Sequence, residues 1–78
     1  MNIEDYSTAA TRHPFWEQIT TDLEHRFAHS DHMRQWAIEL VSAKLMGVPA
    51  RVENAKRVLG EVASNDVITV CRGYGVDL

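Results

Sequence analysis

The organisation of this chain is set by residues 30–47, SDHMRQWAIELVSAKLMG. Apolar residues recur there every three or four positions, which predicts a helix over residues 31–46. Ser30 is suited to cap its start, and Gly47 is suited to the left-handed residue that follows a helix. This helix is apolar around most of its circumference, which is typical of the central helix of a bundle. The narrow strip expected to face water is Gln35, Glu39 and Ser42.

Two further helices are predicted on either side of this segment. Residues 11–29 carry Pro14 in the expected first turn, where its missing N–H loses no helical bond. Residues 49–63 begin with Pro49, and Gly60 within them indicates either close packing or an early helix end. The buried stripe expected in the first helix is Phe15, Trp16, Ile19, Leu23 and Phe27. The buried face expected in the third is Val48, Val52, Ala55, Leu59 and Val62.

The last segment, residues 66–78, has a different character. Residues 67–71 are mostly β-branched, which favours a short strand, although a fourth helix capped by Asn65 or Asp66 is the alternative. Residues 1–10 are weakly patterned and are expected to form a poorly ordered arm. The sequence therefore predicts one small all-α domain over residues 1–78. Its architecture would be a compact three-helix bundle with a short C-terminal strand or helical turn.

Composition excludes several classes of protein. The chain has 78 residues, of which 45% are hydrophobic and 24% are charged, as in globular proteins. Its single cysteine cannot form an internal disulfide, and no apolar run is long enough to span a membrane. No secretory signal, phosphate loop, dinucleotide fingerprint or nucleophile elbow is present. We therefore expect a cytoplasmic protein that is not an enzyme, uses no cofactor and has no membrane partner.

One constellation has the residue types of a metal site. Asp22, His25 and His29 are spaced i, i+3 and i+7, which places them on one face of the first predicted helix. The simpler interpretation pairs Asp22 with His25 on the surface and leaves His29 near the helix C-terminus. No metalloenzyme motif surrounds these residues, so no metal is predicted.

Residues 43–49, AKLMGVP, resemble the turn of the helix-turn-helix family of DNA-binding proteins. A small residue stands four positions before the turn glycine, and an apolar residue follows it. The resemblance implies a transcription regulator whose recognition helix is the third predicted helix. Two features depart from the family pattern: Pro49 replaces the usual polar cap, and Val52 comes one position early. The alternative is an ordinary helical hairpin. The DNA-contacting residues that the resemblance implies are Lys44, Arg51, Asn54, Lys56 and Arg57.

Charge and size favour a different function. The formal net charge is −3, and six acids against two arginines lie within residues 1–33. Arg12 and Arg26 are interleaved with these acids, so a solvated outer face is the simpler interpretation of the acids themselves. Together with the lack of catalytic motifs, size and acidity indicate a non-catalytic protein-interaction module, such as a small accessory or inhibitor protein of the kind phages and mobile elements encode. Its partner would be a larger protein machine, with a nucleic-acid-processing complex as one candidate. The expected contact residues are Glu17, Asp22, Glu24, Val67, Ile68, Val70 and Tyr74.

The chain is also expected to form a homodimer. A domain of this size has a thin core, and an isolated strand at residues 67–71 would lack a partner within the chain. DNA is a partner only under the helix-turn-helix interpretation.

Overall fold

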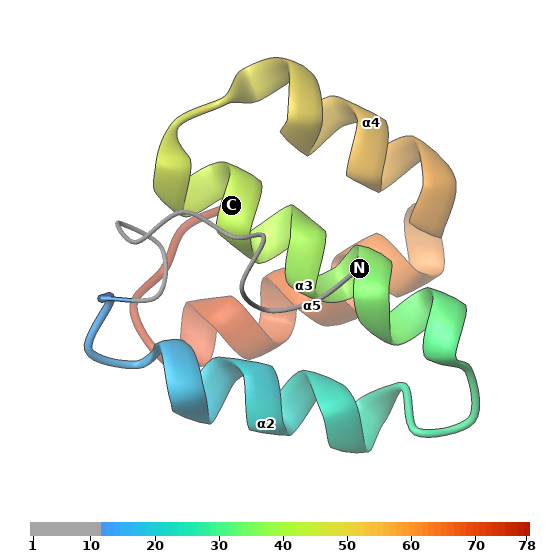
Figure 1. The fold of residues 1–78 in the computed structure, drawn as a ribbon, viewed down its shortest axis with the longest axis horizontal. Coiled ribbons are helices and arrows are strands. Elements are labelled where there is room, and N and C mark those ends of the chain that lie inside the picture. The colour runs from blue at the N-terminus through green and yellow to red at the C-terminus, as the bar shows by residue number, and fades with distance from the viewer. Residues whose placement is uncertain (1–11) are drawn as a thin grey trace.

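The computed structural model describes residues 12–78, and these form four helices without a strand (Figure 1). The helices are α2 (Trp16–Arg26), α3 (Asp31–Met46), α4 (Pro49–Leu59) and α5 (Glu61–Gly73). The described part has similar extents in all directions, 26 × 25 × 24 Å. The all-α class is confirmed, but the bundle contains one helix more than the sequence predicts. The expected arm at residues 1–10 lies outside the described residues.

Helix α3 packs against α2, α4 and α5, and α5 likewise contacts the other three helices. The bounds of α3 are those predicted, since both of its ends are fixed by local chemistry. The Ser30 hydroxyl accepts a hydrogen bond from the Met33 backbone N–H at 3.2 Å, and Gly47 is left-handed with φ 72°. The prediction of a polar strip is wrong at two positions. Glu39 and Ser42 are buried, with 5% and 0% exposure, because other helices cover this side of α3 as well.

Helix α2 is shorter than the predicted range of residues 11–29. Pro14 lies in a turn ahead of the helix, and residues 27–29 form a turn after it. The amphipathic pattern nevertheless identifies the buried face: Trp16, Ile19, Leu23 and Phe27. Phe15 is the exception, because it precedes the first helical residue and is 41% exposed.

Gly60 divides the third predicted helix into two. Its φ of 85° and ψ of 172° fall in a region that only glycine adopts readily, so α4 ends there and α5 begins one residue later. No atom lies within 4 Å of the position a Cβ would take, so the backbone conformation and not close packing explains the glycine. Because of this break, Val62 does not continue the buried face of α4. It is 80% exposed, contrary to the prediction.

The strand predicted at residues 67–71 is wrong, because this segment belongs to α5. Ala63, Val67 and Cys71 are spaced four residues apart and are all buried in the core. Burial at helical spacing thus outweighs the β-propensity of the branched residues. The alternative caps, Asn65 and Asp66, are wrong too, since the helix starts at Glu61.

The chain folds back after α5. Gly75 is left-handed with φ 79°, and the Val76 N–H donates to the Cys71 carbonyl at 2.9 Å. This bond and that from Gly75 to the Arg72 carbonyl form a Schellman motif. Val76 is thereby buried in the core, and Leu78 reaches the surface of α3 and α4.

Candidate interaction surfaces

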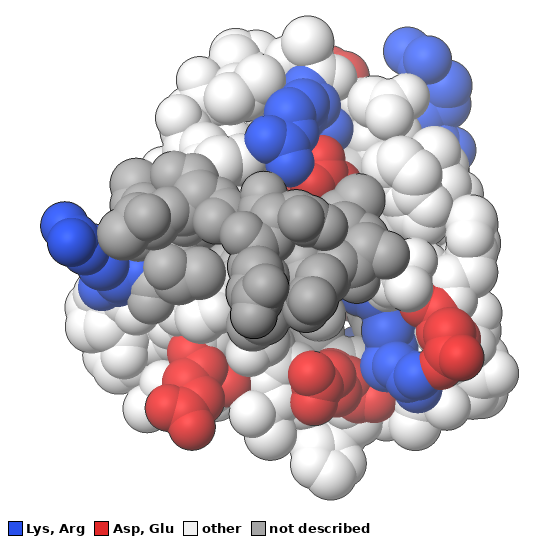
Figure 2. Space-filling view, viewed as in Figure 1, with Lys and Arg blue, Asp and Glu red and all other residues white. Residues whose placement is uncertain are grey.

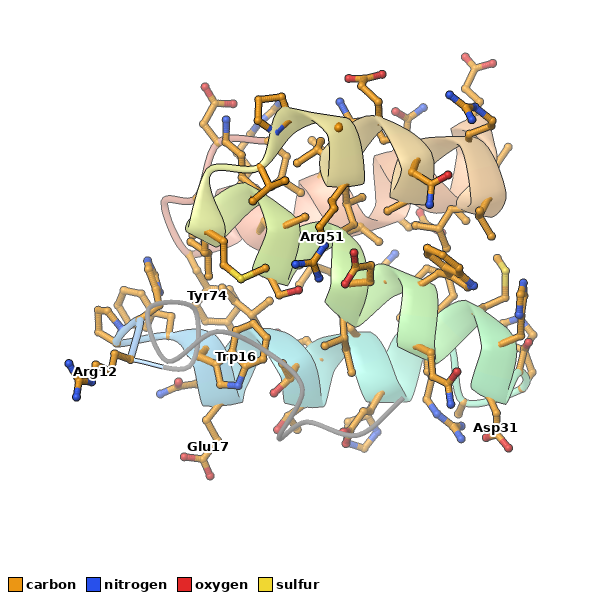
Figure 3. The ribbon with its side chains drawn as sticks, turned by 45° about the horizontal axis from the view of Figure 1, so that its top comes forward. Arg12, Trp16, Glu17, Asp31, Arg51 and Tyr74 are labelled. Carbon is orange, nitrogen blue, oxygen red and sulfur yellow. The ribbon has the colours of Figure 1, made fainter. Side chains whose placement is uncertain are left out.

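The three predicted acidic contact residues of α2 are all exposed. At 100° per residue, Glu17 and Glu24 lie at nearly the same angle around the helix, about 10 Å apart along its axis. Figure 3 shows Glu17 pointing away from the bundle. Asp22 lies on the other flank of the outer surface, toward α5. Asp22 is five residues from Glu17, so the two differ by about 140° around the helix and do not share one side. We call the outer surface of α2 that spans Glu17, Asp22 and Glu24 the α2 acidic face.

Asp22 is held by a residue that is distant in the sequence. The Tyr74 hydroxyl donates a hydrogen bond to Asp22 Oδ2 at 2.6 Å, which ties the end of α5 to the middle of α2. This hydrogen bond, with smaller contributions from desolvation and from the Asp22 charge, raises the pKa of Tyr74 above 10.0. Glu17 and Thr21 join this pair in lining a shallow hollow of about 370 Å³.

The ion pairs of the described residues leave the α2 acidic face without a cation. Arg26 pairs with Asp66 at 3.4 Å, Arg34 with Asp31, and Arg51 with Glu39 at 2.5 Å. Within residues 12–78, no ion pair involves Glu17, Asp22 or Glu24. Figure 2 shows Asp and Glu side chains gathered along the lower edge of the molecule, where Figure 1 draws α2. The outer surface of α2 therefore carries three acids that form no ion pair among the described residues, although Arg26 lines a hollow together with Asp22.

The C-terminal segment offers less contact surface than predicted. Val67 is fully buried, so it cannot reach a partner, and the helical α5 has no sheet edge to offer. Ile68, Val70 and Tyr74 are partly exposed. Val70 lines a shallow hollow of about 420 Å³ together with Asp22, His25 and Arg26. Val70 and Tyr74 thus border α2, and their exposed atoms extend the α2 acidic face onto α5.

The basic residues implied by the helix-turn-helix resemblance point in different directions. Around α4, Arg51 lies on one flank and Lys56 on the opposite flank, with Arg57 between them on the outer side. Arg51 binds Glu39 of α3 through its Nε and Nη2 atoms. Asn54 and Lys44 are exposed, but Lys44 belongs to α3. The five residues therefore do not share one face.

The arrangement of α3 and α4 also differs from the family pattern. Figures 1 and 3 both show α4 running back along α3, as in a helical hairpin, and these two helices make the most extensive contact in the bundle. In a helix-turn-helix the two helices cross at roughly 90–120°.

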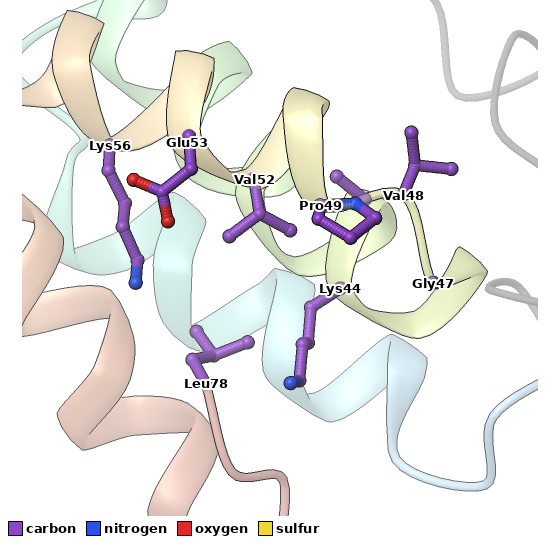
Figure 4. A pocket seen from close by; sticks show the side chains of 9 residues that line it. Lys44, Gly47, Val48, Pro49, Val52, Glu53, Lys56 and Leu78 are labelled. Atoms are coloured by element: carbon purple, nitrogen blue, oxygen red, sulfur yellow. The ribbon is translucent and has the colours of Figure 1, made fainter.

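A hollow of about 270 Å³ lies between the end of α3, the start of α4 and the C-terminal residues (Figure 4). Its lining includes the apolar side chains of Ala43, Val48, Val52 and Leu78. Lys44, Glu53 and Lys56 complete its polar rim. We call it the Lys44–Lys56 hollow.

The described residues do not assemble the metal-ligand set considered in the sequence, and the Cys71 thiol is not activated. Within residues 12–78, no three His, Cys, Asp or Glu side chains form a group that could hold a metal, so Asp22, His25 and His29 are not brought together as ligands. Burial raises the pKa of the Cys71 thiol from 9.0 to about 12. The thiol is therefore protonated at neutral pH and cannot act as a thiolate.

Comparison of the chain with protein-family models, curated proteins and solved structures finds no match. Within the described residues, no helix is both long enough and apolar enough to cross a bilayer.

Sequence reasoning missed two features of the surface. The first is the pair of Arg51 with the buried Glu39, for which the signal is an acid in the apolar middle of α3, between Ile38 and Leu40. The second is the Lys44–Lys56 hollow. It depends on the return of Leu78 to α3 and α4, and nothing in the sequence near Leu78 signals this.

Proposed function

We propose that this chain is a non-catalytic protein-interaction module that binds a basic surface of a larger protein through the α2 acidic face. The observation that carries the proposal is the set of exposed carboxylates on α2 that form no ion pair among the described residues. Such a face attracts a positively charged partner and speeds the encounter.

One carboxylate of the α2 acidic face, that of Asp22, is held in a fixed orientation. The hydrogen bond from Tyr74 fixes one carboxylate oxygen, so the other oxygen of Asp22 is held in one orientation at the border of α2 and α5. A pre-ordered acceptor loses less entropy when a partner's arginine or lysine binds it. A partner that itself binds nucleic acid has the required basic surface. We therefore propose that the chain acts as an accessory or inhibitor protein of a nucleic-acid-processing complex.

Affinity capture with matched variants tests this proposal. Tagged wild-type protein is used to capture partners from a nuclease-treated lysate of the source organism. The same is done with a Glu17→Lys/Glu24→Lys double variant. We expect the captured protein to be lost from the double variant, because two attractive charges become repulsive.

The control keeps the change in net charge but moves it off α2. Glu61→Lys/Asp77→Lys alters two exposed acids outside this helix, and it should retain the captured protein. Equal capture by wild type and the α2 variant would remove this surface from consideration.

A DNA-binding regulator is the second candidate, and the glycine-ended α3 followed by the proline-started α4 is the observation that favours it. It predicts a salt-dependent shift of duplex DNA that Arg57→Ala weakens. We rank it lower, because Arg51 is engaged by Glu39 and Arg57 lies on another side of α4 from Lys56.

A further inference from the structure

We propose that the Lys44–Lys56 hollow is a second docking site, which takes an acidic peptide segment of a partner protein with one apolar side chain inserted between α3 and α4. The hollow shares no residue with the α2 acidic face, and its charge is opposite. The inference therefore does not depend on the surface proposed above.

The floor of the hollow explains the apolar part of the ligand. Ala43 and Val52 form part of the core, with 0% and 9% exposure, and Val48 and Leu78 are half-buried around them. A space of about 270 Å³ is sufficient for a leucine-sized side chain, whereas a nucleic-acid backbone has no apolar group to place there.

The lysines on the rim of the hollow are the reason for proposing an acidic peptide. Figure 4 shows Lys44 and Lys56 on either side of Leu78, at two edges of the hollow. Within residues 12–78, neither ammonium group has a carboxylate within ion-pair distance. Glu53 also lies on the rim, so two cations face one carboxylate there. The balance favours an anionic ligand and predicts that Glu53 weakens its binding.

The chain itself shows what kind of residue fits. Leu78 lines the hollow, and the residue before it is the exposed Asp77. An apolar side chain of the chain itself therefore already meets α3 and α4 at this place. A partner segment of the same chemistry would pack against Leu78 while its acids pair with the two lysines.

The test is an amide NMR titration of the full chain. The probe is an acetylated pentapeptide in which one leucine stands between two pairs of glutamates. We expect saturable shifts centred on Ala43, Val52 and Leu78. Replacing the peptide's leucine by serine should abolish them.

Variants separate this site from a general charge effect. Lys44→Glu or Lys56→Glu should weaken the peptide about fivefold each, and Glu53→Gln should strengthen it about twofold, since each alters one charge at the rim. Arg57→Glu, on the outer side of α4, should leave the affinity unchanged.

Three results would overturn the proposal. The first is a titration without saturable shifts at the hollow. The second is equal weakening by Arg57→Glu and by the lysine variants, which would show nonspecific attraction. The third is a duplex oligonucleotide that binds these residues in place of the peptide, which would make the hollow part of a DNA-binding surface.

Discussion

Arg51 of α4 grips the buried carboxylate of Glu39 in α3 with two hydrogen bonds, from Nε to Oε2 at 2.8 Å and from Nη2 to Oε1 at 2.5 Å. Figure 3 shows Arg51 reaching from α4 toward α3. Because Glu39 is only 5% exposed, it depends on this guanidinium to offset the loss of water around its charge. The ion pair therefore links α4 to α3. Because its guanidinium binds Glu39, Arg51 is less accessible to a DNA phosphate than an unpaired arginine.

Removal of the guanidinium should destabilise the protein. Arg51→Ala leaves the Glu39 carboxylate buried without this partner, and we expect a loss of about 2 kcal/mol in the free energy of unfolding. The figure is below that of a fully buried pair because the Arg51 side chain is 42% exposed. Urea denaturation measures it, with the exposed Arg57→Ala as the control, expected within about 0.5 kcal/mol of wild type. A loss no larger than the control's would show that the pair is not stabilising.

The junction of α4 and α5 should not accept a side chain. Gly60→Ala must place alanine at φ 85° and ψ 172°, and we expect a cost of about 2 kcal/mol. Gly73 provides the matched control, since it lies in α5 without a positive φ and has open space at its Cβ position. Gly73→Ala should be neutral or stabilise by about 0.5 kcal/mol in the same thermal melt. Equal melting temperatures for the two variants would contradict this account of Gly60.

The sequence was sufficient wherever an element is defined by nearby residues. The hydroxyl of Ser30, the left-handed Gly47 and the ring of Pro49 each act within one helical turn, so the ends of α3 and the start of α4 were predictable. The same holds for the α2 acidic face, because the buried stripe of that helix also determines which residues face outward.

The features that were not predictable depend on contacts between distant parts of the chain. The helical state of residues 67–71 follows from the burial of Val67 and Cys71 against other helices, which local β-propensity cannot show. Asp22 and Tyr74 are 52 positions apart, and Glu39 and Arg51 belong to different helices. Gly60 was partly predictable. A glycine within a helical pattern indicates either close packing or a helix end, and the sequence did not distinguish the two.

Alkaline pH should weaken the fold through Cys71. In the unfolded chain the thiol loses its proton near its ordinary pKa of 9.0, whereas the folded protein keeps it until about pH 12. Between these values the folded state binds more protons, so the free energy of unfolding falls as pH rises. Urea denaturation at several pH values should therefore show a shallower decline above pH 9.0 for Cys71→Ala than for wild type. Parallel curves for the two proteins would show that the thiol is not protected.

The bond between Tyr74 and Asp22 should be visible in the ultraviolet spectrum. Because Asp22 accepts the phenol hydrogen, Tyr74 should ionise above its ordinary pKa of 10.0. The Tyr6→Phe variant leaves Tyr74 as the only tyrosine, and absorbance at alkaline pH then reports it alone. Asp22→Ala should return the midpoint toward 10.0, whereas Glu24→Ala should not. An unshifted midpoint in the Tyr6→Phe protein would mean that the hydrogen bond does not persist in solution.

Self-association remains a prediction, but the structural features that favour it differ from those expected from the sequence. The isolated strand no longer supports it, because α5 buries Val67 and Cys71 within the chain. Two exposed valines support it instead, since Val62 of α5 is 80% exposed and Val58 of α4 is 40% exposed. We expect a dimer by light scattering at tens of micromolar. Val62→Glu should weaken it at least about tenfold, because a charge replaces the apolar contact in both copies.

Two observations separate this contact from loss of folding or from a general charge effect. Val62→Glu should unfold within about 0.5 kcal/mol of wild type, because the side chain is exposed. Thr69→Glu introduces the same charge at another exposed position of α5 and should leave the dimer intact. A wild-type mass equal to one chain would rule out self-association. A dimer that survives Val62→Glu would place the contact on another surface.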